Sequence, residues 1–138
     1  MSRIMAIDYG TKKTGIAVTD PLKIIANGLD TVPTGELMAF LDGYFFTEVV
    51  ETMVFGEVIR ADGTPGSNHK KIQNLMAHIA KKYPNINLTT FDESFTSLRA
   101  KEIILKSGVK KKKRQDKTLV DKISAVLILQ DYMEANGI

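Results

Sequence analysis

The pattern of apolar and polar positions divides the chain into short runs typical of strands and longer stripes typical of helices. Clusters of β-branched and aromatic residues between turn residues predict strands at 4–7, 16–18, 24–32, 52–55 and 86–91. Apolar residues at helical spacing predict helices from 33–34 through 45, about 68–83, about 96–107 and about 118–135. The last helix is apolar nearly all round, so we expect it to be largely buried.

The order of these elements predicts an α/β fold. Three strands come first, and strands and helices alternate after them, which favours antiparallel pairing followed by βαβ units. We therefore expect a mixed five-stranded sheet with helices on both faces. The chain shows no repeat, linker or change of composition, so a single domain over 1–138 is expected.

A strand, a glycine turn and a second strand at residues 3–19 form the most informative stretch. Asp8 ends the first apolar run, and the turn that follows contains Gly10 and Gly15. An aspartate here can simply cap the turn. A carboxylate directly on a buried strand, however, is costly without a partner, and a cation is one natural partner. Thr11 and Thr14 could contact phosphate oxygens, so we expect this turn to belong to an active site.

Other carboxylates occupy equivalent places along the chain. Glu57 and the pair Asp92–Glu93 also end apolar strands, and Asp121 lies in the first turn of the last helix. Ligands of open α/β sheets bind outside the carboxyl ends of the strands. Gathered carboxylates favour a hard divalent ion such as Mg²⁺ or Mn²⁺, which can serve phosphodiester hydrolysis.

Each of these carboxylates also has a simpler interpretation. Asp121 could serve the helix dipole, and Asp92–Glu93 could form a helix entry, with Glu93 favoured over Asp92 as a ligand. Glu57 could be a metal ligand, a substrate contact or a solvated loop residue.

Three blocks of the sequence resemble one known family. They begin at Asp8-Tyr9-Gly10-Thr11, at Asp92-Glu93-Ser94-Phe95 and at Asp121-Lys122-Ile123-Ser124, and they are similar to the signature blocks of the YqgF/RuvX family. The resemblance covers essentially the whole chain. It implies a ribonuclease H-like fold and a metal-dependent nuclease resembling Holliday junction resolvases, with Asp8, Glu93 and Asp121 as the acidic triad. It also implies maturation of the 5′ end of pre-16S ribosomal RNA, with branched DNA as the alternative substrate.

One block departs from the family pattern. The family commonly has Gly-x-Pro after the fourth strand, whereas here Gly56-Glu57 is followed by Val58, and the proline stands at Pro65. We expect this loop to be less constrained than a proline would make it. The departure leaves open that Glu57 supplements or replaces Glu93 as a ligand.

Positive charge is concentrated in one segment. Residues 106–117 hold seven basic residues and one acidic residue, net +6, whereas the remaining 12 basic and 15 acidic residues give −3. Such a cluster can be a solvated surface, but beside an acidic site it is expected to contact a nucleic-acid backbone. The residues expected to form this track are Thr11, Lys12, Lys13, Thr14, Thr96, Arg99, Lys110, Lys111, Lys112, Lys113 and Arg114. His69 and His78 are expected to be surface helix residues without a catalytic role.

Composition narrows the classes of function. The 138 residues include no cysteine, which excludes disulfides, thiolate metal sites and a cysteine nucleophile. No apolar run is long enough to span a bilayer and no signal peptide is visible, so a cytoplasmic protein without a membrane partner is expected.

Three functions compete on these grounds. The first is a nuclease acting on precursor rRNA or branched DNA, as a monomer or homodimer and in contact with the precursor of the small ribosomal subunit. The second is a non-catalytic nucleic-acid-binding factor in ribosome assembly. The third, an actin-like ATPase, is disfavoured because 138 residues leave no second lobe to close over a nucleotide.

Overall fold

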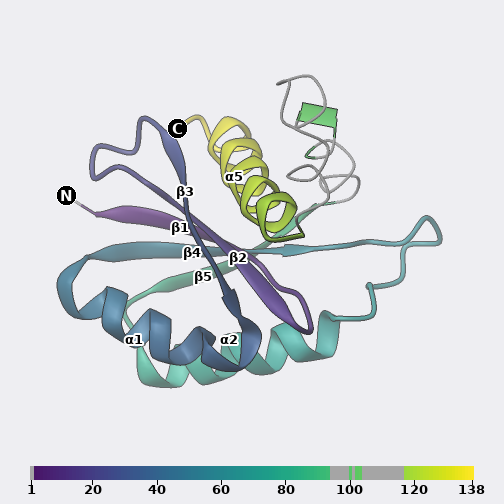
Figure 1. Ribbon diagram of the computed structural model, residues 1–138, viewed down its shortest axis with the longest axis horizontal. Helices are drawn as coiled ribbons and strands as arrows, with labels where there is room; N and C mark the ends of the chain where they lie inside the picture. The colour runs from purple at the N-terminus through teal and green to yellow at the C-terminus, as the bar shows by residue number, and fades with distance from the viewer. Residues whose placement is uncertain (1, 94–99, 101, 104–116) are drawn as a thin grey trace.

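A five-stranded sheet forms the centre of the computed structural model, which describes residues 2–93, 100, 102–103 and 117–138 (Figure 1). The strands are β1 (Arg3–Asp8), β2 (Lys13–Thr19), β3 (Ala26–Pro33), β4 (Val50–Glu57) and β5 (Asn87–Asp92). They lie in the order β3-β2-β1-β4-β5. All five predicted strands are therefore present in one sheet.

The sheet is mixed, as predicted. β2 pairs antiparallel with both β1 and β3, whereas β1, β4 and β5 run parallel to one another. Because parallel strands end on the same side, Asp8, Glu57 and Asp92 stand at one edge of the sheet. This edge is where ligands bind in open α/β folds.

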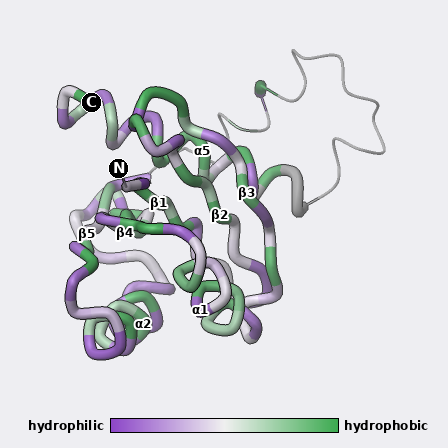
Figure 2. The backbone as a smooth tube through the Cα atoms, turned by 90° about the vertical axis from the view of Figure 1, so that its left-hand side faces the viewer, coloured by the Kyte–Doolittle hydropathy of each residue, from purple (hydrophilic) through white to green (hydrophobic). Residues whose placement is uncertain are grey.

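Helices cover both faces of the sheet. The short 3₁₀ helix η1 (Thr34–Glu36) leads into α1 (Leu37–Thr47), which lies with α2 (His69–Lys82) on one face. The last helix, α5 (Lys117–Ala135), packs on the other face, and Figure 2 shows the sheet between the two layers. Of the helix expected at about 96–107, only Ala100, Glu102 and Ile103 are among the described residues, and they are helical.

Strand alternation divides the apolar side chains into two cores. Met5, Ile7, Met53 and Phe55 point toward α1 and α2 and are fully buried. Ile4, Ala6 and Val54 point the other way and pack with Ala125, Ile128 and Leu129 of α5. The burial expected for the last helix is confirmed by these contacts. Successive residues of each strand therefore belong to opposite faces, and this rule extends to the strand ends.

All five strands differ from the predicted ranges by one to three residues at their ends. β3 begins at Ala26 rather than at residue 24, because the amides of Ile24 and Ile25 donate to Asp20 Oδ1 at 2.7 and 2.8 Å instead of joining the ladder. β4 extends to Glu57, which pairs with Asp92 of β5. No helix among the described residues is long and apolar enough to cross a bilayer.

Candidate active site

Asp8 and Glu93 lie on the face of the sheet that α5 covers. Asp8 follows Ile4 and Ala6 in the strand alternation, and both of these residues pack against α5. On the far side of β4, Glu93 follows Phe91, whose ring meets Tyr132 of α5 edge to face at 6.2 Å between centroids. The alternation therefore brings these two predicted ligands to one side of the strand ends.

Gly56 provides the space between these two carboxylates. It is the next residue after Phe55, which pairs with Ile7, so it lies on β4 beside Asp8 of β1. A Cβ atom built on Gly56 would lie 2.6 Å from Ile128 Cδ1, 2.9 Å from Glu93 Cδ and 3.0 Å from Glu93 Oε2. The Glu93 carboxylate thus packs over bare backbone, at a position where any side chain would displace it.

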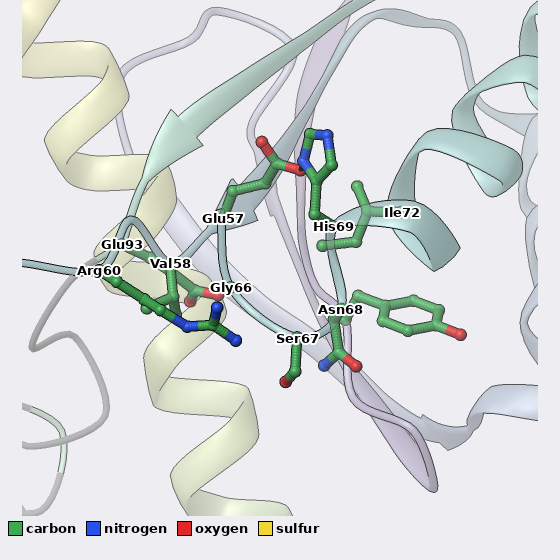
Figure 3. A pocket seen from close by; sticks show the side chains of 10 residues that line it. Glu57, Val58, Arg60, Gly66, Ser67, Asn68, His69, Ile72 and Glu93 are labelled. Atoms are coloured by element: carbon green, nitrogen blue, oxygen red, sulfur yellow. Dashed lines mark hydrogen bonds and ion pairs between the residues drawn. The ribbon is translucent and has the colours of Figure 1, made fainter. Parts of the chain in front are cut away.

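Glu57 points to the opposite face, toward α2. Its side chain is 11% exposed, and its Oε1 lies 2.8 Å from His69 Nδ1 (Figure 3). His69 is the first residue of α2 and is half-buried. His69 is thus a surface helix residue, as predicted, but its contact with Glu57 was not foreseen, and His78 is exposed as predicted.

The missed contact had one signal in the sequence. A carboxylate at the end of a buried strand needs a partner, and a histidine follows it at the start of the next helix. The intervening loop of more than ten residues hid their proximity, because sequence distance says little about contact across a loop.

Asp92 also belongs to the α2 side of the sheet. It follows Leu88 in the alternation, which packs against the α1–α2 core, and its own side chain is exposed. The preference for Glu93 over Asp92 thus agrees with the alternation of β5. Asp92 and Glu57 are paired across the two strands, away from Asp8 and Glu93.

Asp121 lies in α5, and its side chain is outside the described residues. Its position in the helix is four residues before Ala125 and seven before Ile128, both of which pack against the sheet. This spacing belongs to one helix face. Within the described part of the chain, no three His, Cys, Asp or Glu side chains are grouped so that they could hold a metal.

The residues that are described fit a hard divalent ion in their chemistry. Asp8 and Glu93 supply carboxylate oxygens, the ligands that Mg²⁺ and Mn²⁺ prefer. Gly56 leaves open space where the Glu93 carboxylate lies. Of the described carboxylates at this edge, only Asp8 and Glu93 belong to the face that α5 covers.

The turn between β1 and β2 is held by hydroxyl contacts. Thr34 Oγ1 lies 2.9 Å from Thr14 Oγ1 and donates to the Gly10 carbonyl at 2.6 Å. The Thr34 amide donates to the Lys12 carbonyl at 2.9 Å. A Cβ atom on Gly10 would lie 2.3 Å from the Lys13 carbonyl oxygen, so the turn requires glycine there.

Thr14 is one of the predicted nucleic-acid contacts that the structure contradicts. Its side chain is fully buried and engaged with Thr34, so it stabilises the turn and is not available to a phosphate. Thr11, Lys12 and Lys13 are exposed at the same turn, as a backbone contact requires. The other residues of the predicted track, Thr96, Arg99, Lys110, Lys111, Lys112, Lys113 and Arg114, lie outside the described residues.

The loop after β4 is held by contacts of its own backbone and side chains. Its two sides pair through a bridge between Ile59 and Pro65, and the Gly66 amide donates to the Val58 carbonyl at 2.8 Å. At its tip Asp62 Oδ1 accepts from both the amide and the hydroxyl of Thr64. Residues 58–66 thus form a short hairpin-like arm, held by hydrogen bonds rather than by a proline at position 58.

A pocket opens where this arm meets the strand ends. It has a volume of about 220 Å³ and extends from the Glu57–His69 pair to Glu93 (Figure 3). Its other lining residues are Tyr9, Val58, Arg60, Gly66, Ser67, Asn68 and Ile72. No role at a functional site is predicted from the sequence for Tyr9, Arg60, Ser67 or Asn68.

Comparison with known proteins places the chain among nucleases. The family described as RuvX, Holliday junction resolvase, matches residues 2–135. A protein of Christiangramia forsetii is 50% identical over 133 residues, which cover 96% of this chain and 98% of that protein. A protein of Parabacteroides distasonis is 49% identical over 135 residues, covering 98% and 96%. The names of both relatives propose a pre-16S rRNA nuclease.

Solved structures share the fold at low sequence identity. The Holliday junction resolvase of fowlpox virus has a TM-score of 0.56 at 13% identity, covering 96% of this chain and 99% of that one. T. thermophilus RuvC, solved in complex with a Holliday junction substrate, has a TM-score of 0.55 at 17% identity, covering 99% and 97%. These similarities confirm the predicted ribonuclease H-like fold.

Proposed function

The chain belongs to the RuvX family and is therefore a nuclease, a hydrolase that acts on ester bonds. We propose that it cuts nucleic acid by a metal-dependent mechanism. The proposed centre consists of Asp8, Glu93 and Asp121. We propose that the protein generates the mature 5′ end of 16S rRNA in the cytoplasm, by cutting the rRNA of the small-subunit precursor.

One observation carries the proposal: Asp8 and Glu93 flank Gly56 on the face that α5 covers. Two carboxylates brought to one side of neighbouring strands repel each other unless a cation joins them. The helical register of Asp121, in line with Ala125 and Ile128, supports it as the third member.

A bound Mg²⁺ or Mn²⁺ would supply an activated water and charge stabilisation at the scissile phosphate. The chain's own residues have separate tasks. Asp8 and Glu93 would hold the cation at the strand ends, and Gly56, which has no side chain, leaves room for the Glu93 carboxylate. Thr11, Lys12 and Lys13, exposed at the adjacent turn, are positioned to contact the phosphate backbone.

Precursor rRNA is the preferred substrate because the relatives at about half identity carry that activity in their names. Branched DNA is the second candidate, supported by the family description and by the fold shared with junction resolvases. Both substrates require the same acidic centre, so the distinction between them depends on an experiment.

The test is cleavage of an end-labelled pre-16S rRNA leader and of a four-way DNA junction, each with Mg²⁺, Mn²⁺ or EDTA. Wild type and Asp8→Asn are compared side by side. Metal-dependent cutting of one substrate, lost in the variant, is expected, and the labelled products then also distinguish internal from terminal cleavage.

Binding without cleavage by both proteins would contradict the proposal. It would leave the chain as a nucleic-acid-binding factor in ribosome assembly. Cleavage that persists in EDTA and in Asp8→Asn would equally contradict the acidic centre.

A further inference from the structure

The Glu57–His69 pocket is distinct from the proposed acidic centre and yet continuous with it. Glu57 and Glu93 come from the ends of neighbouring strands, and their side chains belong to opposite faces of the sheet. Both nevertheless line the same pocket. An occupant of this pocket would therefore adjoin the place where the scissile phosphate would lie.

The Glu57–His69 pair is fixed in position by the fold. The Glu57 side chain is 11% exposed and stands on a paired strand, and His69 begins a helix of 14 residues. Burial of a carboxylate is costly, so its retention beside a pocket needs compensation, which His69 partly supplies. A carboxylate accepts more than one hydrogen bond, so Glu57 can still accept from a donor in the pocket.

The size and lining of the pocket limit what can enter. About 220 Å³ is below the roughly 300 Å³ at which pockets for whole small molecules begin. One part of a polymer fits better than a separate ligand. Tyr9, Val58 and Ile72 offer apolar surface, including one aromatic ring. The polar groups come from Glu57, Arg60, Ser67, Asn68, His69 and Glu93. This mixture suits a flat, polar-edged ring, since unpaired bases stack on aromatic side chains and bond through their edges.

We propose that this pocket holds an unpaired cytosine of the substrate strand, next to the scissile phosphate, with the exocyclic amino group donating to Glu57. A pyrimidine is the smaller kind of base, and cytosine carries the N4 amino donor that acidic side chains recognise. Uracil has a carbonyl oxygen at that position, which an ionised carboxylate repels. The inference rests on the proposed nuclease function, to which it adds a preference for an unpaired cytosine.

The test measures binding apart from cleavage. Fluorescence anisotropy with labelled single-stranded oligocytidine and oligouridine of equal length, in EDTA, gives the base preference of the wild type. The variants are Glu57→Gln and His69→Gln. Glu51→Gln is the matched control, because Glu51 lies on the same strand but pairs with Lys23 at the opposite end.

Wild type and Glu51→Gln are expected to bind oligocytidine about tenfold more tightly than oligouridine. Glu57→Gln is expected to lose this preference. His69 would bond to the amide oxygen of the new side chain, so the pocket would be left with the amide nitrogen, a donor, in place of the second carboxylate oxygen. His69→Gln is expected to weaken the preference while the circular dichroism spectrum stays native.

Equal binding of the two oligonucleotides by the wild type would overturn the proposal, as would an unchanged preference in a folded Glu57→Gln protein. Because no metal is present, these outcomes do not depend on cleavage. Metal-dependent cutting by a protein that does not prefer oligocytidine would contradict the cytosine pocket and leave the proposed nuclease function intact.

Discussion

Single residues at the strand ends decide which carboxylates can act together. Asp92 and Glu93 are neighbours in sequence, but strand alternation sends them to opposite faces of the sheet. Glu93 occupies the side of Asp8 and α5 because Gly56 has no side chain in its way. The proposed acidic centre therefore depends on a glycine as much as on its acids.

Replacing Gly56 with alanine should damage activity more than stability. The added Cβ would meet Ile128 at 2.6 Å and the Glu93 carboxylate carbon at 2.9 Å, so the carboxylate must move. We expect a loss of stability of about 1–3 kcal/mol from overpacking. Displacing Glu93 by about 1 Å should lower the cleavage rate by about 100-fold. Urea denaturation and initial cleavage rates measure the two effects.

Gly43→Ala is the matched control for this substitution. Gly43 lies within α1, where a built Cβ meets nothing within 4 Å. Alanine favours a helix over glycine by up to about 1 kcal/mol, so this variant should be equally or more stable and fully active. An active Gly56→Ala protein would show that Glu93 is not needed where the structure places it.

Some of these features of single residues could be predicted from the sequence, and others could not. Asp8 was predictable because it stands directly on an apolar strand and precedes a glycine turn. The choice of Glu93 over Asp92 needed the register of β5, which one residue of slippage would reverse. His69 was missed because its contact with Glu57 depends on the path of the 58–66 arm.

Secondary elements are joined by a few polar contacts outside the core. The Thr34 hydroxyl links the start of η1 to Thr14 and to the Gly10 carbonyl, so it fixes the turn beside Asp8. At the other end of the molecule, Asp42 of α1 accepts from Lys82 and Tyr83 at the end of α2. These contacts set the position of the turn and the spacing of the two helices.

Thr34→Val should loosen the turn between β1 and β2. It removes both hydroxyl contacts and leaves the fully buried Thr14 hydroxyl without this partner. The expected loss is about 1–3 kcal/mol in the free energy of unfolding, measured by urea denaturation. Thr47→Val is the control, since the exposed Thr47 hydroxyl makes only a 3.4 Å contact, and it should change stability by less than about 0.5 kcal/mol. Equal effects of the two substitutions would rule out a special role for Thr34.

The Asp42 contact should make stability depend on pH. A hydrogen bond from Lys82 lowers the pKa of Asp42 below its ordinary value, and a second one from Tyr83 lowers it further. The stabilisation is therefore present above the unfolded pKa of about 3.9 and is lost as the pH falls through the lowered folded value. Asp42→Asn should have a lower melting temperature than wild type at neutral pH, and the difference should shrink in acid.

A double-mutant cycle tests the origin of this dependence. In a Lys82→Met background, Asp42→Asn should cost less than in the wild type, because the principal partner is already gone. A difference between Asp42→Asn and wild type that stays constant down to acid pH would argue against this contact.

For the whole molecule, more of the fold than of the candidate site could be predicted from the sequence. The alternation of short apolar runs and helical stripes indicated all five strands, the mixed sheet and helices on both faces. Local pattern determines these features because each element must bury an apolar face. The pocket between Glu57 and Glu93 could not be predicted, since it forms where three separate segments meet.

We propose one acidic centre, on the α5 side of the sheet edge. A binding surface for the substrate strand would then extend from the exposed Lys12 and Lys13 across the strand ends to the Glu57–His69 pocket. This arrangement would let the protein hold the backbone on one side and a base on the other.

The most direct test compares three variants in one metal-dependent cleavage assay with the better of the two substrates. Asp8→Asn and Glu93→Gln should each abolish cutting, whereas Asp92→Asn, one residue away but on the opposite face, should cut as the wild type does. If Asp92→Asn abolished cleavage while Glu93→Gln left it intact, the acidic centre would lie on the α2 side and the account would be wrong.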